Sequence, residues 1–404
     1  MGNPAGEDLE EKTVVFGITG GIAAYKAPMI VRGLKKLSLD VHVVTTDSAG
    51  YFVTPLVLQT LSGRPVLTEM FPEVPGSSYE IDHIALADQA DLFLVAPATA
   101  DFLAKLAHGI ADDLLSCSIL ATKAPVLVCP SMNVNMLSNP ATRDNIEILK
   151  RRGFHVLEPA SGELACGWEG AGRLPDPDRI VSEVKRLLSR HDLSGINILI
   201  TSGPTCEDID PVRYITNRST GKMGGAIVEA ACLRGARVTV ISGPVGIDYA
   251  PWATLVDARS AGEMLNAVRE NLAGCDVLIM AAAVADYTPQ VYSQNKIKKG
   301  EKMTHLELDS TPDILSTIRP LKESRIFVGF AAETDNLKTY AQDKMIRKGL
   351  DMIVANRVGE KGSGFASETN SGVVLSQEGV LYDFEHMAKE TLAHKILDLV
   401  KDKL

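Results

Sequence analysis

The chain has 404 residues, 45% hydrophobic and 23% charged, a balance typical of a soluble globular protein with two to three domains. With 51 acidic against 41 basic residues the net charge is -10, which argues against a nucleic-acid partner, because phosphate neutralisation needs clustered positive charge. The longest apolar run, residues 277–285, is about half of the ~20 residues that cross a bilayer, so no membrane partner is expected.

The compartment is predicted from the N-terminus and the cysteines. The first twelve residues lack the basic and then apolar order of a signal peptide. The six cysteines contain no C-x-x-C pair, so neither a zinc site nor a disulfide framework is indicated. The sequence therefore predicts a protein of the reducing cytoplasm.

In chain order, short apolar runs rich in Val and Ile alternate with stretches of helical period. The first runs are VVFGITG (14–20), VHVVTT (41–46), LFLVAPA (92–98) and VLVCPS (126–131). A proline-containing segment at 174–195 predicts a boundary, and the alternation then restarts with NILITSGPT (197–205), followed by helices from about Gly221 and Ser260. This pattern predicts an α/β fold with two successive three-layer domains, residues 13–190 and 191–404, the first a doubly wound parallel sheet.

The first strand runs into a turn at Gly20 and Gly21, where a helix begins. Free N–H groups at such a helix start can hold a phosphate. The G-x-G-x-x-G pattern is absent, and the next strand ends in Thr45 and Thr46 rather than in a ribose-binding acid, which argues against NAD. A purely structural turn remains the alternative.

Four spaced motifs extend this first half: GGIAAYKA (20–27), FVTPL (52–56), the segment 83–115 and PSMNVNM (130–136). Together they resemble the flavin-binding cysteine decarboxylases. The bacterial form of these enzymes is the first half of a bifunctional enzyme of coenzyme A biosynthesis, phosphopantothenoylcysteine decarboxylase fused to phosphopantothenate cysteine ligase. The resemblance covers the chain from about residue 14, and implies a flavoprotein-like first domain and a Rossmann-like, nucleotide-binding second domain.

The resemblance also implies roles for residues of the first domain. His83 matches the catalytic histidine, Asn133 the asparagine that holds the substrate carboxylate, and Cys166 the acid on a substrate-covering flap. Ser131 departs from the alanine that is usual in the family. FMN contacts are implied for Gly20, Gly21, Ile22, Ala23, Thr46, Ser48, Ala96, Pro97, Ala98 and Thr99.

The chemistry gives these residue types a reason of its own. A carboxylate on an sp3 carbon leaves only when an electron sink is created, which flavin can provide by oxidising the terminal CH2–SH group. A histidine can act as base in that step, and a thiol in a glycine-rich flap can return a proton later. The alternatives are purely structural roles: a helix cap for His83 and a small buried hydrophobic residue for Cys166. We assign Cys117 and Cys129 to the core, and His42 and His108 to structural roles.

The second half opens with a strand and the segment DPVRYITNRSTGKMG (210–224). It is not a P-loop, because Thr216 stands where the first glycine belongs and Met223 where the hydroxyl belongs. A strand, a turn and a glycine-rich helix start still suit a nucleotide phosphate. Residues 288–303 are polar and basic without period, which predicts a mobile loop.

Further motifs, NKIKK (295–299), TPDIL (311–315) and GFAAET (329–334), follow in the order found in phosphopantothenate cysteine ligases. The resemblance implies activation of the substrate carboxylate by CTP as an acyl-cytidylate, with Mg2+ on the triphosphate. Lys296 matches the catalytic lysine, Asn217 an amide donor to the intermediate, and Arg213 a charge for its phosphate or for the attacking partner, two roles left open. CTP contacts are implied for Asp286, Lys296, Pro312, Asp313, Ile314, Leu315, Phe330, Lys344 and Lys348, the last two on one helix face.

Our interpretation is a bifunctional enzyme that joins 4'-phosphopantothenate to cysteine with CTP and then decarboxylates the product to 4'-phosphopantetheine. A flavin prenyltransferase would leave residues 196–404 unexplained. A regulatory protein built on an inactive decarboxylase is disfavoured by the presence of His83, Asn133 and Cys166. The resemblance implies trimers of the first domain and dimers of the second, hence a homo-oligomeric dodecamer. The sequence does not identify metal ligands.

Overall fold

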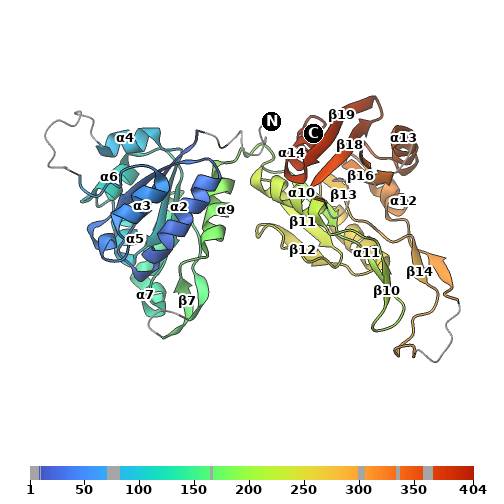
Figure 1. Ribbon diagram of the computed structural model, residues 1–404, viewed down its shortest axis with the longest axis horizontal. Helices are drawn as coiled ribbons and strands as arrows, with labels where there is room; N and C mark the ends of the chain where they lie inside the picture. The colour runs from blue at the N-terminus through green and yellow to red at the C-terminus, as the bar shows by residue number, and fades with distance from the viewer. Residues whose placement is uncertain are drawn as a thin grey trace. The chain divides into compact units, whose positions relative to one another are not determined.

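The computed structural model describes residues 9, 11–70, 82–163, 167–298, 305–333, 337–357 and 367–404. The chain divides into two compact units, the first ending at Ser189 and the second running from Arg190 to Leu404 (Figure 1). Each unit is built on its own sheet covered by helices, which confirms the predicted pair of α/β folds. No helix among the described residues is long and apolar enough to cross a membrane.

Unit 1 contains a five-stranded parallel sheet in the order β2-β1-β3-β4-β5. Its strands are β1 (Thr13–Ile18), β2 (Asp40–Thr45), β3 (Leu92–Ala98), β4 (Val126–Pro130) and β5 (His155–Val156). Its helices are η1 (Ile22–Lys26), α2 (Ala27–Lys36), η2 (Asp47–Tyr51), α3 (Pro55–Ser62), α4 (Asp82–Gln89), α5 (Ala100–His108), α6 (Leu114–Ala121), α7 (Val134–Ser138), α8 (Pro140–Arg151) and α9 (Pro177–Leu188). The order is that of a doubly wound sheet whose direction reverses between β1 and β3.

Alternation along the strands gives this sheet two buried faces. In β1, Phe16 packs into one core cluster and Val15 into the other. A Cβ at Gly33 would lie 2.6 Å from Val181, so α2 and α9 pack closely over one face. An antiparallel hairpin, β6 (Ala160–Glu163) and β7 (Glu169–Arg173), follows the sheet. Sheet and helices together form the three layers of the unit.

Unit 2 contains an eight-stranded sheet in the order β12-β11-β8-β13-β16-β17-β18-β19. Its strands are β8 (Asn197–Ser202), β11 (Arg237–Ser242), β12 (Thr254–Asp257), β13 (Val277–Met280), β16 (Ile326–Glu333), β17 (Met352–Arg357), β18 (Thr369–Ser376) and β19 (Gly379–Ala388). Its helices are α10 (Lys222–Leu233), α11 (Ala261–Leu272), α12 (Ile314–Ile318), η3 (Arg319–Leu321), α13 (Leu337–Lys348) and α14 (Lys389–Lys401). The first six strands are parallel and have the 3-2-1-4-5-6 order of a Rossmann fold.

The last two strands of this sheet are antiparallel, a feature the sequence analysis did not predict. α14 then returns to pack against α10, where the guanidinium of Arg234 is completely buried. Arg234 forms ion pairs with Asp192 at 2.7 Å and Asp398 at 2.8 Å, so the start of unit 2 is joined to its last helix.

Two short antiparallel pairs lie outside the main sheet of unit 2. They are β9 (Cys206–Asp208) with β10 (Tyr214–Thr216), and β14 (Tyr287–Pro289) with β15 (Leu308–Ser310). The first pair follows the carboxyl end of β8, and the second follows β13. The segment predicted as a loop at 288–303 therefore begins in a strand, and its described part is hydrogen-bonded to the residue before β15 and to the β9–β10 turn.

Candidate active sites

The predicted flavin residues of unit 1 lie in three places: the loop and η1 after β1, the loop and η2 after β2, and the end of β3 with the first residue of the loop that follows it. A Cβ at Gly20 would lie 2.2 Å from the Cβ of Ser48, and one at Gly21 would lie 3.7 Å from the Thr99 side chain. The three loops thus meet where the strand order reverses, which is where ligands bind in open parallel sheets. Only glycine fits at position 20, and its backbone therefore lines the loop surface.

The polar groups around this turn fall into two kinds. Thr19, which the sequence analysis missed, joins two loops: its hydroxyl donates to the Pro97 carbonyl at 2.8 Å and accepts from the Thr99 N–H at 3.1 Å. Thr46 Oγ1 is buried and has no hydrogen-bond partner among the described residues. A buried hydroxyl without a partner is costly, so a bound ligand that satisfies it is favoured. This orphaned atom and the glycine cradle fit a flavin nucleotide.

Exposure separates the remaining predicted flavin contacts. Ala96 and Ala98 are completely buried, whereas Thr99 is partly exposed and caps α5 by accepting from the Phe102 N–H. Ile22 is 58% exposed beside a buried Ala23. The accessible members of the set therefore include the turn itself, Ile22, Ser48 and Thr99.

Asn133 follows β4 and caps α7, accepting from the Asn135 N–H at 2.8 Å. The segment before it is joined to the β6–β7 hairpin. The Gly172 carbonyl accepts from the Met132 N–H at 3.0 Å and from the Ser131 hydroxyl at 3.4 Å. The serine that departs from the family pattern thus contacts the flap strand. Cys166 lies outside the described residues.

His83 is partly buried on α4. Figure 1 shows α4 and α7 on opposite sides of unit 1. A group of exposed apolar side chains lies on η1, α2, η2 and α3 of the same unit: Ile22, Tyr25, Met29, Tyr51, Phe52, Leu56 and Val57. Contiguous exposed apolar patches mark interaction surfaces, and these side chains are the candidates for one in unit 1.

In unit 2, the predicted CTP residues of α13 meet those after β15 and in β16. Lys344 donates to the Phe330 carbonyl at 3.0 Å, and Lys348 pairs with Asp313, the N-cap of α12. Burial alone would raise the pKa of Asp313, but hydrogen bonds from Lys348 and Ser316 outweigh it and hold the pKa below its usual value. The pair therefore holds a cation beside the α12 N-terminus.

The remaining predicted CTP-binding residues other than Lys296 lie near this pair. The Asp286 carbonyl accepts from the Thr311 N–H at 3.0 Å, immediately before Pro312, and the Asp286 side chain is exposed. Pro312 is exposed and Leu315 partly buried, whereas Ile314 is 3% exposed and belongs to the core. Asp286, Pro312, Asp313, Phe330, Lys344 and Lys348 thus form a connected group at the carboxyl ends of β13 and β16.

Asn217 faces the loop after β13. Its Nδ2 donates to the carbonyls of Ala283 at 3.2 Å and Val284 at 2.9 Å. Both amide hydrogens are thereby engaged by the backbone. The predicted role as amide donor to an intermediate would require these bonds to be exchanged, and Oδ1 is the atom placed to accept from a ligand.

Arg213 lies in the β9–β10 turn and pairs with Asp210 at 3.0 Å; it also donates to the Ile297 carbonyl, next to the exposed Lys296. Asp210, which the sequence analysis did not select, is 1% exposed. The Asp-Pro start of this turn was its only sequence signal. Figure 1 shows β10 and β14 extending away from α13.

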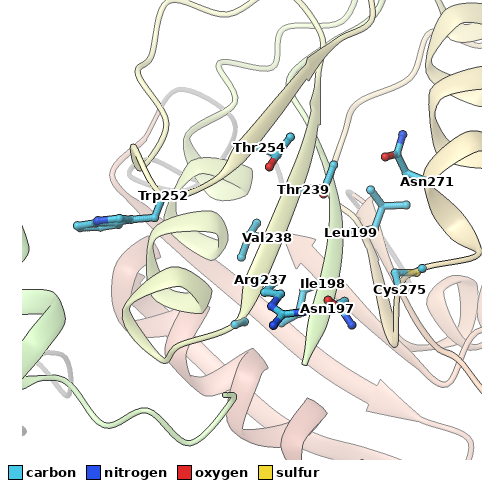
Figure 2. A pocket seen from close by; sticks show the side chains of 12 residues that line it. Asn197, Ile198, Leu199, Arg237, Val238, Thr239, Trp252, Thr254, Asn271 and Cys275 are labelled. Carbon is cyan, nitrogen blue, oxygen red and sulfur yellow. The ribbon is translucent and has the colours of Figure 1, made fainter. Parts of the chain in front are cut away.

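A pocket of about 430 Å3 lies elsewhere in unit 2, at the amino ends of β8, β11 and β12 (Figure 2). Its lining includes Arg237, Trp252 and Asn271 and none of the predicted site residues. Because ligands of open parallel sheets bind at the opposite, carboxyl edge, this pocket is not the candidate site. Within the described ranges, no group of three His, Cys, Asp or Glu residues is placed to hold a metal ion.

Comparison with known proteins found one family model for each half of the chain. The flavoprotein family model matches residues 3–189, and the model of the DNA/pantothenate metabolism flavoprotein C-terminal domain matches residues 193–404. The coenzyme A biosynthesis bifunctional protein CoaBC of Vibrio cholerae is 43% identical over 401 residues, which are 98% of this chain and 100% of that protein. The CoaBC protein of Escherichia coli strain K12 is 45% identical over 377 residues, 92% of each chain.

Among solved structures, the C-terminal domain of a CoaBC protein is 38% identical, with a TM-score of 0.45, and the match covers 52% of this chain and 97% of that one. The full-length relatives and the two domain models together confirm the predicted family. The chain belongs to the family of coenzyme A biosynthesis bifunctional proteins.

Proposed function

We propose that unit 2, residues 191–404, ligates cysteine to 4'-phosphopantothenate with CTP, and that unit 1, residues 13–190, decarboxylates the product with FMN. The chain is thus both a phosphopantothenate cysteine ligase and a phosphopantothenoylcysteine decarboxylase. The observation that carries the proposal is the match of both domain models and of full-length bifunctional relatives to one continuous chain. The predicted residues at the carboxyl edges of both sheets support it.

In the decarboxylase, the Gly20 turn would hold FMN, which would supply the redox chemistry that creates the electron sink. The backbone of this turn, in which the Gly21 N–H already donates to the Thr19 carbonyl at 3.0 Å, would hold its phosphate, and the Thr46 hydroxyl would gain a partner. Asn133 orients the substrate carboxylate, His83 accepts a proton in the oxidative step, and Cys166 returns one after CO2 has left. The β6–β7 hairpin, attached through Met132, carries the segment that covers the substrate.

In the ligase, Lys344 and Lys348 face the CTP phosphates, and Asp286 and Phe330 contact the cytidine. Mg2+ would accompany the nucleotide and offset the charge of its triphosphate. Lys296 stabilises the negative charge that develops on the departing pyrophosphate. Asn217 and Arg213 then act on the acyl-cytidylate as cysteine attacks.

Assembly and compartment are part of the proposal. Because α4 and α7 lie on opposite sides of unit 1, His83 of one subunit completes the site of another, and the exposed apolar side chains of η1 to α3 form the contact. We place the enzyme in the cytoplasm as a homo-oligomer, a dodecamer of unit 1 trimers and unit 2 dimers.

The first test is direct. The purified chain should be yellow with oxidised-flavin absorbance. Given CTP, 4'-phosphopantothenate and cysteine, it should release pyrophosphate and CO2 and form 4'-phosphopantetheine, detected by mass spectrometry. Pyrophosphate without CO2 would contradict the decarboxylase half alone, and the reverse result with 4'-phosphopantothenoylcysteine would contradict the ligase half.

Two variants separate the ligase steps. Lys296→Gln should lower pyrophosphate release about 100-fold, because it removes a charge that acts on the first step. Asn217→Asp should still form the acyl-cytidylate but react poorly with cysteine, because its carboxylate repels both the Ala283 and Val284 carbonyls and the cytidylate phosphate. Mass spectrometry for acyl-cytidylate without cysteine distinguishes them, and Asn295→Asp, an exposed change near Lys296, is the control. Equal accumulation in both variants would contradict the assignment.

A further inference from the structure

Asp210 has a buried carboxylate that the proposed chemistry does not use. Its residue is 1% exposed, and its side chain is completely buried. Carboxylates are almost never buried unless charges and hydrogen bonds compensate the lost hydration. The partners of each oxygen therefore indicate what this residue holds in place.

One oxygen holds the residue's own turn. Asp210 Oδ1 accepts from the N–H of Val212 at 2.8 Å and from the N–H of Arg213 at 2.9 Å. These bonds fix the turn between β9 and β10. Any side chain with an oxygen at this position, including asparagine, can keep them.

The second oxygen reaches a segment 87 residues further along the chain. Asp210 Oδ2 accepts from the Ile297 N–H at 3.2 Å and pairs with Arg213 Nη2 at 3.0 Å. The same Arg213 nitrogen donates to the Ile297 carbonyl. Both polar groups of the residue after Lys296 are thus held by one ion pair.

The surrounding bonds agree with a charged carboxylate and a fixed segment. Burial alone would raise the pKa of Asp210, but the N–H groups of Val212, Ile297 and Arg213 outweigh it and lower the pKa. The Ser293 N–H also donates to the Ile209 carbonyl at 3.0 Å. The arm that carries Lys296, residues 290–298, is therefore hydrogen-bonded to the β9–β10 turn at two points.

We propose that Asp210 is a positioning residue of the ligase: with Arg213 it holds the Ile297 backbone, and so sets where Lys296 stands when pyrophosphate leaves. The proposal rests on the ligase activity proposed above. Asp210 contacts neither substrate nor nucleotide, and its effect passes through Lys296. Misplacing a charge-stabilising group by about 1 Å is enough to cost about 100-fold in rate.

Asp210→Asn tests this in the full chain. Its oxygen can keep the turn, whereas its NH2 group faces the Ile297 N–H and the Arg213 guanidinium, donor against donor. We expect kcat for pyrophosphate release to fall 10- to 100-fold with less than threefold change in KM for CTP, because the contact matters in the transition state. Trypsin should also cut faster after Lys296 and Lys298.

Asp208→Asn is the matched control. Asp208 lies two residues earlier, on β9, and pairs with Arg259 at 2.7 Å without touching Ile297. It should change the rate less than twofold and leave trypsin cleavage as in the parent. Should Asp210→Asn fail to fold, Ile297→Pro removes the same hydrogen bond from the exposed arm, and the same loss of kcat is expected.

A double variant gives the decisive result. If Asp210 acts through Lys296, Asp210→Asn should slow single-turnover pyrophosphate release by less than threefold in a Lys296→Gln background. An equal loss in both backgrounds, or parent-like kcat in both Asp210→Asn and Ile297→Pro, overturns the proposal. If the parent itself releases no pyrophosphate, the ligase function fails rather than the positioning role.

Discussion

The two candidate sites of this chain are built at the same edge of a parallel sheet with different chemistry. In unit 1, the loops after β1, β2 and β3 present a glycine turn and hydroxyl groups, next to the buried Ala96 and Ala98 at the end of β3. In unit 2, the candidate site presents paired charges, Lys348 at the end of α13 with Asp313, and Arg213 with Asp210. The first site is shaped by close packing of neutral groups, and the second by ion pairs.

This difference indicates which kind of substitution should impair each site. A flavin nucleotide in the first site would be held by a closely packed surface of neutral side chains and backbone groups. A triphosphate is bound, broken and released, so its site needs cations kept in place before the substrate arrives. We therefore expect unit 1 to be sensitive to added volume, and unit 2 to be sensitive to charge and pH.

The largest expected effect is that of volume at Gly20. Gly20→Ala places a methyl group 2.2 Å from the Ser48 Cβ and 3.0 Å from its backbone carbon, so the loop must move. Overpacking of this kind costs about 1–3 kcal/mol, and we expect flavin to be lost. Absorbance of the purified variant measures this, and ligase activity should remain.

Gly50→Ala is the control for that change, because no described atom lies within 4 Å of its Cβ position. It should stay yellow. A Gly20→Ala protein with full flavin occupancy would contradict the close-packed description of the first site.

The second prediction concerns charge in unit 2. Burial alone would raise the pKa of Asp192, but hydrogen bonds from Arg234 and Lys401 outweigh it and lower the pKa to about 2. A depressed carboxyl pKa stabilises the fold above the unfolded value of 3.8, and this contribution is lost as the pH falls from 4 towards 2. Asp192→Asn should therefore cost about 2 kcal/mol at pH 7 and much less at pH 2.

Urea unfolding of the full chain at several pH values checks this prediction. In a Trp168→Phe background, Trp252 is the remaining tryptophan, so its fluorescence reports on unit 2. Asp402→Asn, at the exposed end of α14, is the control. A loss of stability that stays constant down to pH 2 would show that Asp192 does not act through its charge.

The smallest expected effect is that of the unpartnered Thr46 hydroxyl on flavin affinity. Thr46→Val removes a buried hydroxyl that has no partner among the described residues. Unit 1 without flavin should be as stable as the parent or up to about 1 kcal/mol more stable, and flavin should bind about threefold to tenfold more weakly. Flavin titration of the apoprotein measures the affinity.

Thr60→Val is the matched change, because the Thr60 hydroxyl donates to the Leu56 carbonyl at 2.7 Å away from the turn. It should leave flavin affinity unchanged. Weaker binding in both variants would point to a general effect of the substitution rather than to the Thr46 hydroxyl.

Local patterns in the sequence determined the elements and their order. The strand β8 coincides with the apolar run that begins at Asn197, α10 begins directly after Gly221, and α11 is capped by Ser260. The i, i+4 spacing placed Lys344 and Lys348 on one face of α13, and both contact neighbouring predicted residues. Such features depend on nearby residues and on strand and helix period, so they are readable without a structure.

The tertiary structure alone decided which distant segments meet. It placed Ser48 against Gly20, engaged the Asn217 amide with the carbonyls after β13, and put α4 and α7 on opposite sides of unit 1. It also brought the Asp210 carboxylate into a hydrogen bond with the N–H of Ile297, 87 residues away, which no local pattern indicates. These contacts depend on how strands are ordered and loops are packed, and that order is set by burial of the whole core rather than by any one segment.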